Sequence, residues 1–167
     1  MRFSTSFVLT GLLATALAAP TAKPHKRAGV LTAQSYAQFQ VSDGVAGNAL
    51  AEVNAKFPID TSDLANVDPG DAQIISDARQ VAESAETDAF NPAIDAASGD
   101  AATALQNGKI KNKVLKLQLE VLDLMISQAQ GDDNQSKIDQ ETTKLNNNIA
   151  LDKKAAGQAS QSVPFDG

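Results

Sequence analysis

The sequence has no cysteine and no tryptophan, and among its 167 residues it has one histidine, one tyrosine and six phenylalanines. Without cysteine there are no disulfides, thiolate nucleophiles, Cys-ligated zinc sites or iron–sulfur clusters. Cations are outnumbered as well, since 14 Lys and Arg oppose 20 Asp and Glu, for a formal net charge of −6. We therefore expect no nucleic-acid partner and no charge-driven binding to anionic membranes. The length predicts one domain.

The first eighteen residues have the pattern of a secretory signal peptide. Met1-Arg2 gives a positive start, and residues 7–19 are apolar apart from two threonines and a glycine. Small residues at Ala16 and Ala18 fit the −3 and −1 positions of a signal-peptidase site. The run is well short of the ~20 residues that a spanning helix needs. We expect cleavage after Ala18, an extracellular protein and no transmembrane segment.

Residues 19–27 predict a propeptide that ends at a dibasic site. Two prolines and the only histidine, His25, precede Lys26 and Arg27. A proline-rich extended segment is open to proteases, and a dibasic pair there is typical of processing by a kexin-type protease. The alternative is a pair of solvated cations in a tail. Processing would leave residues 28–167 as a single helical domain, and loss of the four cations in residues 1–27 would change the formal net charge from −6 to −10.

After such processing the chain would contain neither cysteine nor histidine. That excludes a Ser–His or Cys–His triad, a His-ligated zinc site and acid–base catalysis by histidine. Paired carboxylates for glycoside hydrolysis as a rule work beside sugar-stacking aromatic residues, and tryptophan is absent. We expect no enzyme, with a small hydrolase as the minor alternative, and no catalytic residue, cofactor or metal.

Hydrophobic periodicity predicts an all-α fold, a small antiparallel bundle of four to five helices. Residues 29–42 have the least regular pattern, and we expect an extended arm or a short helical turn that packs Tyr36 and Phe39 on the body. Apolar residues then recur at helical spacing and end before a proline, which predicts a first helix over 44–56 with Asp43 as its N-cap.

The next two helices are predicted from their start signals. Asp68 followed by Pro69 is a strong N-terminal signal, and it predicts a helix over 69–89. Asn91-Pro92 repeats this signal and predicts a separate short helix that ends near residues 98–99.

The most apolar element is a predicted central helix over 109–129, which has neither glycine nor proline. It extends back as far as Ala101 if Asn107-Gly108 acts as a kink. Two apolar seams run along it, and we expect Leu117 on one and Leu122 on the other to be buried against different neighbours. Residues 131–134 predict a turn, and a last helix follows over 135–156. The seams are Ile110, Val114, Leu117, Val121 and Leu124, and Leu115, Leu119, Leu122 and Ile126.

Charge is unevenly distributed along the chain. Residues 57–108 contain ten acids and one cation, Arg79, and four lysines follow at once. The favoured interpretation is that the lysines neutralise the acidic segment within the fold, and the alternative is an anion site. Lys111 is one of these lysines, and we expect it to be exposed. The four lysines are Lys109, Lys111, Lys113 and Lys116.

The predicted turn at Asp132-Asp133-Asn134 has three oxygen-bearing side chains. A calcium loop needs about six ligands at defined spacing, with a late glutamate, so we interpret the segment as a turn. Asn134-Gln135-Ser136 is an N-glycosylation sequon. Asn134 equally suits the N-cap of the last helix, and the sequence leaves both roles open.

Two blocks, YAQFQVSDGVAGNALAEV at 36–53 and NGKIKNKVLKL at 107–117, together with the leader and the dibasic site resemble a group of cysteine-free small secreted proteins of filamentous ascomycete fungi. The resemblance covers the mature chain and implies a fungal secreted protein, without an assigned activity. In size, helicity and secretion the chain is also similar to helical fungal cell-wall proteins that bind lipids or hydrophobic surfaces.

Two functions follow as expectations. The first is a secreted non-catalytic interaction protein, effector-like or associated with the cell wall, whose partner is a protein or a cell-wall or host surface. The second is a carrier or adsorber of lipids, other apolar ligands or hydrophobic surfaces. An apolar pocket above ~300 Å³ would favour the carrier, and a large exposed apolar patch would favour an interaction surface.

Overall fold

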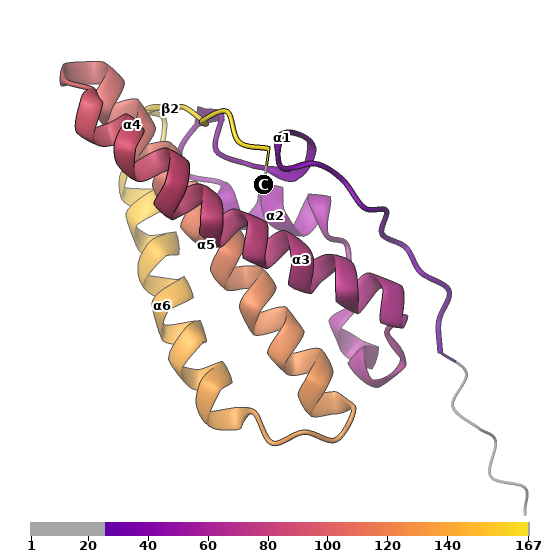
Figure 1. Ribbon diagram of the computed structural model, residues 1–167. Helices are drawn as coiled ribbons and strands as arrows, with labels where there is room; N and C mark the ends of the chain where they lie inside the picture. The colour runs from indigo at the N-terminus through magenta and orange to yellow at the C-terminus, as the bar shows by residue number, and fades with distance from the viewer. Residues whose placement is uncertain (1–25, 167) are drawn as a thin grey trace, which may run out of the picture.

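The longest helix, α5 (Gly99–Ala129), is the centre of the fold, and the other helices pack around it (Figure 1). The structure is a computed structural model, and it describes residues 26–166. The predicted all-α bundle is confirmed. Its other elements are α1 (Tyr36–Phe39), β1 (Gly44–Val45), α2 (Ala49–Lys56), the 3₁₀ segment η1 (Thr61–Asn66), α3 (Pro69–Ala85), the π turn η2 (Glu86–Phe90), α4 (Asn91–Ala96), α6 (Gln135–Lys154) and β2 (Ala159–Ser160).

The two predicted seams of α5 face two separate apolar clusters, except that Ile110 and Leu124 of the first seam are half-buried and belong to neither cluster. Leu122 belongs to the larger one, which α5 forms with α1, α2, η1, α3 and η2, and Leu117 belongs to the smaller one, which includes Ala49 of α2 and Leu145 of α6. Both leucines are buried. A helix that is apolar over two stripes is therefore covered on two sides, as expected for a central helix.

The helix α5 begins ten residues before the predicted Lys109, and it passes Asn107 and Gly108 without a break. The chain near β2 packs directly on this point: a Cβ at Gly108 would lie 1.9 Å from the carbonyl oxygen of Gln161. The Asn107 amide donates to the Ala159 carbonyl oxygen at 2.8 Å. The Asn-Gly pair, expected as a kink, is the place where the C-terminal segment docks.

The segment after α3 differs from the prediction of two separate helices. The helix does not stop at Asn91, because the backbone stays helical through Phe90 and Asn91. In the π turn the Asn91 N–H bonds to the Glu86 carbonyl oxygen, five residues back. Pro92 has no N–H to donate. The π turn before it keeps the backbone helical up to the start of α4. The start signal at Asp68, in contrast, is confirmed, since its side chain accepts from the Gly70 N–H at 2.8 Å.

The predicted first helix over 44–56 was wrong at its start. Residues 44–45 form β1, which pairs with β2 in a two-stranded antiparallel ladder, and α2 begins at Ala49. Asp43 is not the N-cap. Instead, Asp152 near the end of α6 accepts from the Gly47 and Ala49 N–H groups at 2.8 and 2.9 Å. The carboxylate that satisfies the start of α2 thus comes from about a hundred residues away.

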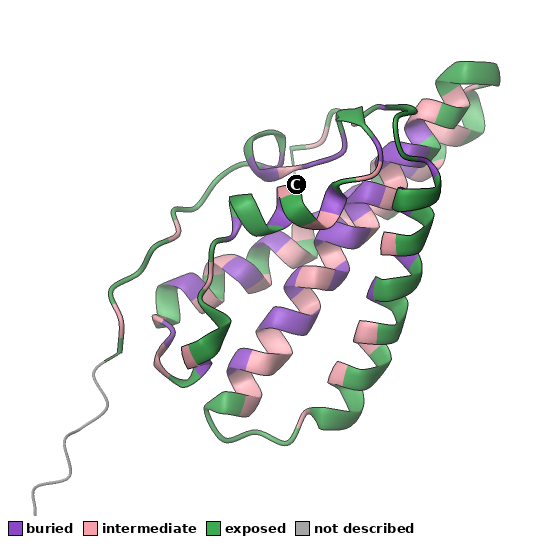
Figure 2. Cartoon of the chain, turned by 180° about the vertical axis from the view of Figure 1, so that it is seen from behind, coloured by how far each residue is buried: buried purple, intermediate pink, exposed green. Residues whose placement is uncertain are grey.

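The last helix, α6, is close to its predicted range, and the residues before it form the predicted turn. Most of α6 is exposed, whereas α5 is mostly buried or half-buried (Figure 2). Among residues 26–166 no helix combines the length and the apolar character needed to cross a bilayer. The predicted signal peptide, with Ala18, lies outside the described residues.

Candidate binding pocket under the N-terminal arm

Residues 27–35 form an extended arm that runs past α3 to the short helix α1 (Figure 1). Asp71, in the first turn of α3, holds the arm. Its carboxylate accepts from the Val30 N–H at 2.8 Å and from the Leu31 N–H at 2.9 Å. Asp71 is buried, and a carboxylate that accepts two backbone N–H groups makes stronger bonds than a neutral acceptor does. The sequence analysis did not identify this contact between Asp71 and the arm.

A pocket of about 220 Å³ lies between the arm, α2 and α3. Its floor is apolar and comes from Phe39, Phe57 and residues of α3, and arm residues 30–34 form one wall. Two charged side chains, Lys56 and Asp77, also line it. An apolar floor with a few polar groups is the usual character of a ligand site.

The aromatic residues on one side of this pocket pack edge to face. Phe39 meets Phe57 edge to face, with ring centroids 6.0 Å apart, and Tyr36 meets Phe39 in the same way at 5.5 Å. The expectation that Tyr36 and Phe39 pack on the body is confirmed. Behind them the Tyr36 hydroxyl donates to Asn112 Oδ1 at 2.8 Å, and the Asn112 amide donates to the Ala82 carbonyl oxygen at 2.8 Å.

Burial raises the pKa of the Tyr36 phenol to about 12. The ring therefore stays neutral, and it remains a hydrogen-bond donor between α1, α5 and α3. This buried link positions α1, and with it the Phe39 wall of the pocket.

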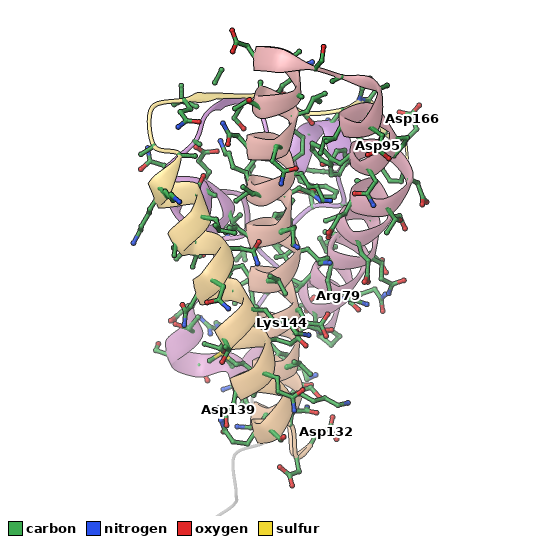
Figure 3. The ribbon with its side chains drawn as sticks, turned by 90° about the vertical axis from the view of Figure 1, so that its left-hand side faces the viewer. Arg79, Asp95, Asp132, Asp139, Lys144 and Asp166 are labelled. Carbon is green, nitrogen blue, oxygen red and sulfur yellow. The ribbon has the colours of Figure 1, made fainter. Side chains whose placement is uncertain are left out.

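A second, polar groove of about 320 Å³ lies between α3 and α6, with α5 at its base. Figure 3 shows Arg79 of α3 and Lys144 of α6 on this face of the molecule. Arg79 pairs with Glu120 at 2.9 Å and Lys144 pairs with Glu141 at 2.7 Å. These cations are already neutralised by carboxylates of the chain.

The predicted lysine group lies partly beside the acidic segment. Lys113 and Lys116 reach Glu86 at 3.6 and 2.8 Å, and Lys109 donates to the Asn91 side chain at 2.6 Å. Burial disfavours the ionised form of Glu86, but the hydrogen bond and charge of Lys116, with the charges of Lys113 and Lys109, outweigh burial and lower its pKa. This arrangement supports neutralisation within the fold over an anion site.

Lys111 is the member of this group for which the prediction was wrong. It is fully buried, not exposed. Its ammonium donates to the carbonyl oxygens of Asp43 and Val45 at 3.0 and 3.1 Å and pairs with Glu52 at 2.9 Å. Lys111 lies one helical turn before Leu115 of the apolar seam, and this spacing was the available signal that it points inward.

The side chains of the turn before α6 are not arranged as a metal site. Within residues 26–166 no three His, Cys, Asp or Glu side chains are placed to share a metal ion. Asn134 occupies the N-cap position of α6, but its side chain makes no capping bond. Its amide nitrogen, the atom that would carry a glycan, donates to Ser127 Oγ at 3.0 Å. Glycosylation of Asn134 stays a prediction.

The predicted processing pair lies at the start of the arm. Lys26 is exposed. Arg27 is only partly exposed, and its guanidinium donates to Asp60 Oδ2 at 2.9 Å and to the Asp63 carbonyl oxygen at 2.8 Å. Arg27 is therefore bound at η1, and processing at this pair stays a prediction.

The fold and the pocket define a small acidic all-α bundle with a pocket of mixed apolar and polar lining beneath an N-terminal arm. The family described as a domain of unknown function, DUF8454, matches residues 31–164, and the chain belongs to this family. The match extends from the arm wall of the pocket to the segment beyond β2. No curated protein matches the chain, and no solved structure does.

Proposed function

We propose that the protein is a secreted, non-catalytic interaction protein that acts at the cell wall or as an effector toward a host or a competitor. The arm pocket is its binding site, and the group that it receives is one apolar side chain of a partner. The observation that carries this proposal is the pocket itself: its floor includes Phe39 and Phe57, the arm forms one wall, and the lining also contains one cation and one carboxylate.

The size of the pocket favours a side chain over a whole lipid. Its volume of about 220 Å³ is below the ~300–1,000 Å³ of sites that enclose drug-sized molecules. A single aromatic or aliphatic anchor in a pocket is, in contrast, a frequent energetic centre of a protein interface. The large exposed apolar residues of the described chain, Val30, Val45 and Leu151, lie on three different segments.

The carrier of apolar ligands remains a second candidate function, because the same apolar floor would accept the end of an acyl chain. Native mass spectrometry of protein purified from culture medium distinguishes the two functions, and it reports processing and glycans in the same measurement. A retained lipid would favour the carrier. A protein that carries no lipid, and does not displace a fluorescent fatty acid, would favour the interaction protein.

A matched pair of variants tests the pocket directly. Ala55 is an exposed residue of α2 that lines the pocket, whereas Ala51 is an exposed residue of the same helix that does not. We expect N-acetyl-leucine amide and N-acetyl-phenylalanine amide to shift the amide NMR signals of the arm and of the pocket-lining part of α3. Ala55→Trp should abolish these shifts and Ala51→Trp should preserve them. Unchanged shifts in Ala55→Trp would refute the site.

A further inference from the structure

The Arg27–Ala28 bond, which the dibasic pattern predicts to be cut, lies against the folded domain. On its N-terminal side, the Arg27 N–H donates to the Asn66 carbonyl oxygen at 2.9 Å. The guanidinium bonds to Asp60 and Asp63 as described above, and its Nε lies 3.6 Å from Asp63 Oδ2. Arg27 is thus fixed to η1 through both its backbone and its side chain.

The residues after this bond are fixed too. The Asp71 carboxylate binds the N–H groups of Val30 and Leu31. Gly29 lies so close that a Cβ there would be 3.1 Å from Asp71 Oδ1 and 3.4 Å from Asp68 Oδ1. An endoprotease must draw the chain on both sides of the bond into its cleft, so local opening has to come first.

We propose that the contacts of Arg27 with Asp60 and Asp63 form a latch that protects the Arg27–Ala28 bond from processing. The guanidinium cannot occupy the specificity pocket of an arginine-directed protease while it is bound to η1. Processing then takes place on chains whose arm is detached, before folding or during local opening. Hydrolysis adds one water across the bond, which leaves a carboxylate on Arg27 and an ammonium on Ala28. This inference does not depend on what the arm pocket binds.

The ion pair between Arg27 and Asp60 is expected to persist at low pH. Hydrogen bonds from Ser62, followed by the guanidinium of Arg27, lower the pKa of Asp60 to about 2. The Arg27 and Asp60 side chains are 38% and 55% exposed, so dissolved salt screens their attraction. The latch is therefore expected to weaken with ionic strength while it tolerates a low pH.

The test uses the chain from Ala19 onward, which contains every described residue, and a kexin-type protease. We compare the rate of cleavage after Arg27 in the folded protein with the rate in a synthetic peptide of residues 19–34. The folded protein should be cut at least about ten-fold more slowly, because cleavage follows the population of the open form. Asp60→Asn/Asp63→Asn should accelerate cleavage of the folded protein without reaching the rate of the peptide, because the backbone contacts of Arg27 and the Asp71 contacts remain. Salt at 0.5 M should accelerate cleavage of the unaltered chain.

The control is Asp95→Asn/Asp133→Asn, which removes the same charge at two exposed positions far along the chain from the arm. It should be cut at the rate of the unaltered chain. Equal rates for the folded protein and the peptide would overturn the protection. A protected chain whose rate is unchanged by Asp60→Asn/Asp63→Asn would overturn the latch. Circular dichroism of each variant confirms that a faster cut does not come from global unfolding.

Discussion

The two sides of α5 are built differently. Toward α3 and α1, it packs into the larger apolar cluster, which includes the aromatic residues Tyr36, Phe39, Phe57 and Phe90. Toward α6, the apolar cluster consists of five buried residues, of which α6 itself supplies one, Leu145. The other two buried residues of α6, Asn148 and Asp152, are polar. One side of the central helix is an extended core, and the other is a narrow apolar strip with polar contacts.

This difference indicates where the fold opens most readily. Segments with few buried apolar contacts open at lower free energy than the core does. The helix α6 has its polar anchor, Asp152, near its C-terminal end, next to α2 and the chain into β2. The turn end of α6 has no buried residue before Leu145. We therefore expect opening to begin at the α5–α6 turn, away from the arm pocket.

The largest effect should come from removing an apolar side chain on the α3 side. Leu122→Ala is expected to cost about 4 kcal/mol of unfolding free energy, because the large cluster cannot collapse around the cavity. Leu117→Ala, in the small cluster to which α6 contributes only Leu145, should cost about 2 kcal/mol. Urea denaturation of both variants measures the difference. Equal costs would show that the two sides are equally rigid and would contradict the comparison.

Lys111→Ala is the next test, and its expected cost is about 3 kcal/mol. The change leaves two backbone carbonyl oxygens near β1 without their donor and leaves Glu52 without its cation. Lys111→Met, which keeps most of the buried chain, serves as the control and should cost less. Denaturant unfolding measures the loss of unfolding free energy in Lys111→Ala. A loss below about 0.5 kcal/mol, the value usual for an exposed position, would mean that the ammonium is not needed for folding.

Most features of the fold that depend on residues close together in the sequence were predicted correctly. The start of α3 follows from Asp68 and Pro69 and was correct. The two seams of α5 follow from helical spacing and were correct except at Ile110 and Leu124, which are half-buried. Two features that the sequence missed involve long-range contacts, whereas the burial of Lys111 had a local signal in its spacing from Leu115. The N–H groups at the start of α2 are bound by Asp152, and Gly108 of α5 is where Gln161 packs closely.

The pocket was unpredictable for the same reason. Its wall of residues 30–34 is held by Asp71, forty residues further along the chain. No local pattern in the arm indicates that a carboxylate of α3 will bind its backbone. The side chains that form the floor are ordinary core residues in the sequence, and they become a pocket only where the arm covers them incompletely.

Asp152→Asn tests the polar anchor on the α6 side. One amide oxygen can still accept a backbone N–H, but the NH₂ group would face the other donor, so we expect a loss of about 1–2 kcal/mol. Hydrogen exchange should accelerate in α2 and in the C-terminal half of α6, and much less in α3. Acceleration of the same size in α3 would show that the two sides of α5 open together.

The smallest effect concerns charge at the α3–α5 contact and its dependence on pH. Burial raises the pKa of Asp123, and the charge of Arg79 and the Ser76 hydroxyl only partly offset this. An acid with a raised pKa in the folded state weakens that state as the pH rises through the interval between its unfolded and folded values. Asp123→Asn should therefore stabilise the protein at pH 7, by less than about 1 kcal/mol, and the gain should vanish near pH 3.

Glu86, whose pKa is lowered, should behave with the opposite sign. Its contribution to stability is present at neutral pH and is lost as the pH falls, so Glu86→Gln should destabilise the protein at pH 7 and become neutral in acid. Thermal melts of both variants between pH 3 and 7 provide the measurement. Parallel curves for the two variants would show that neither the burial of Asp123 nor the lysines beside Glu86 shift these carboxyl groups in opposite directions, and the contrast between the two sides of α5 would then rest on apolar packing alone.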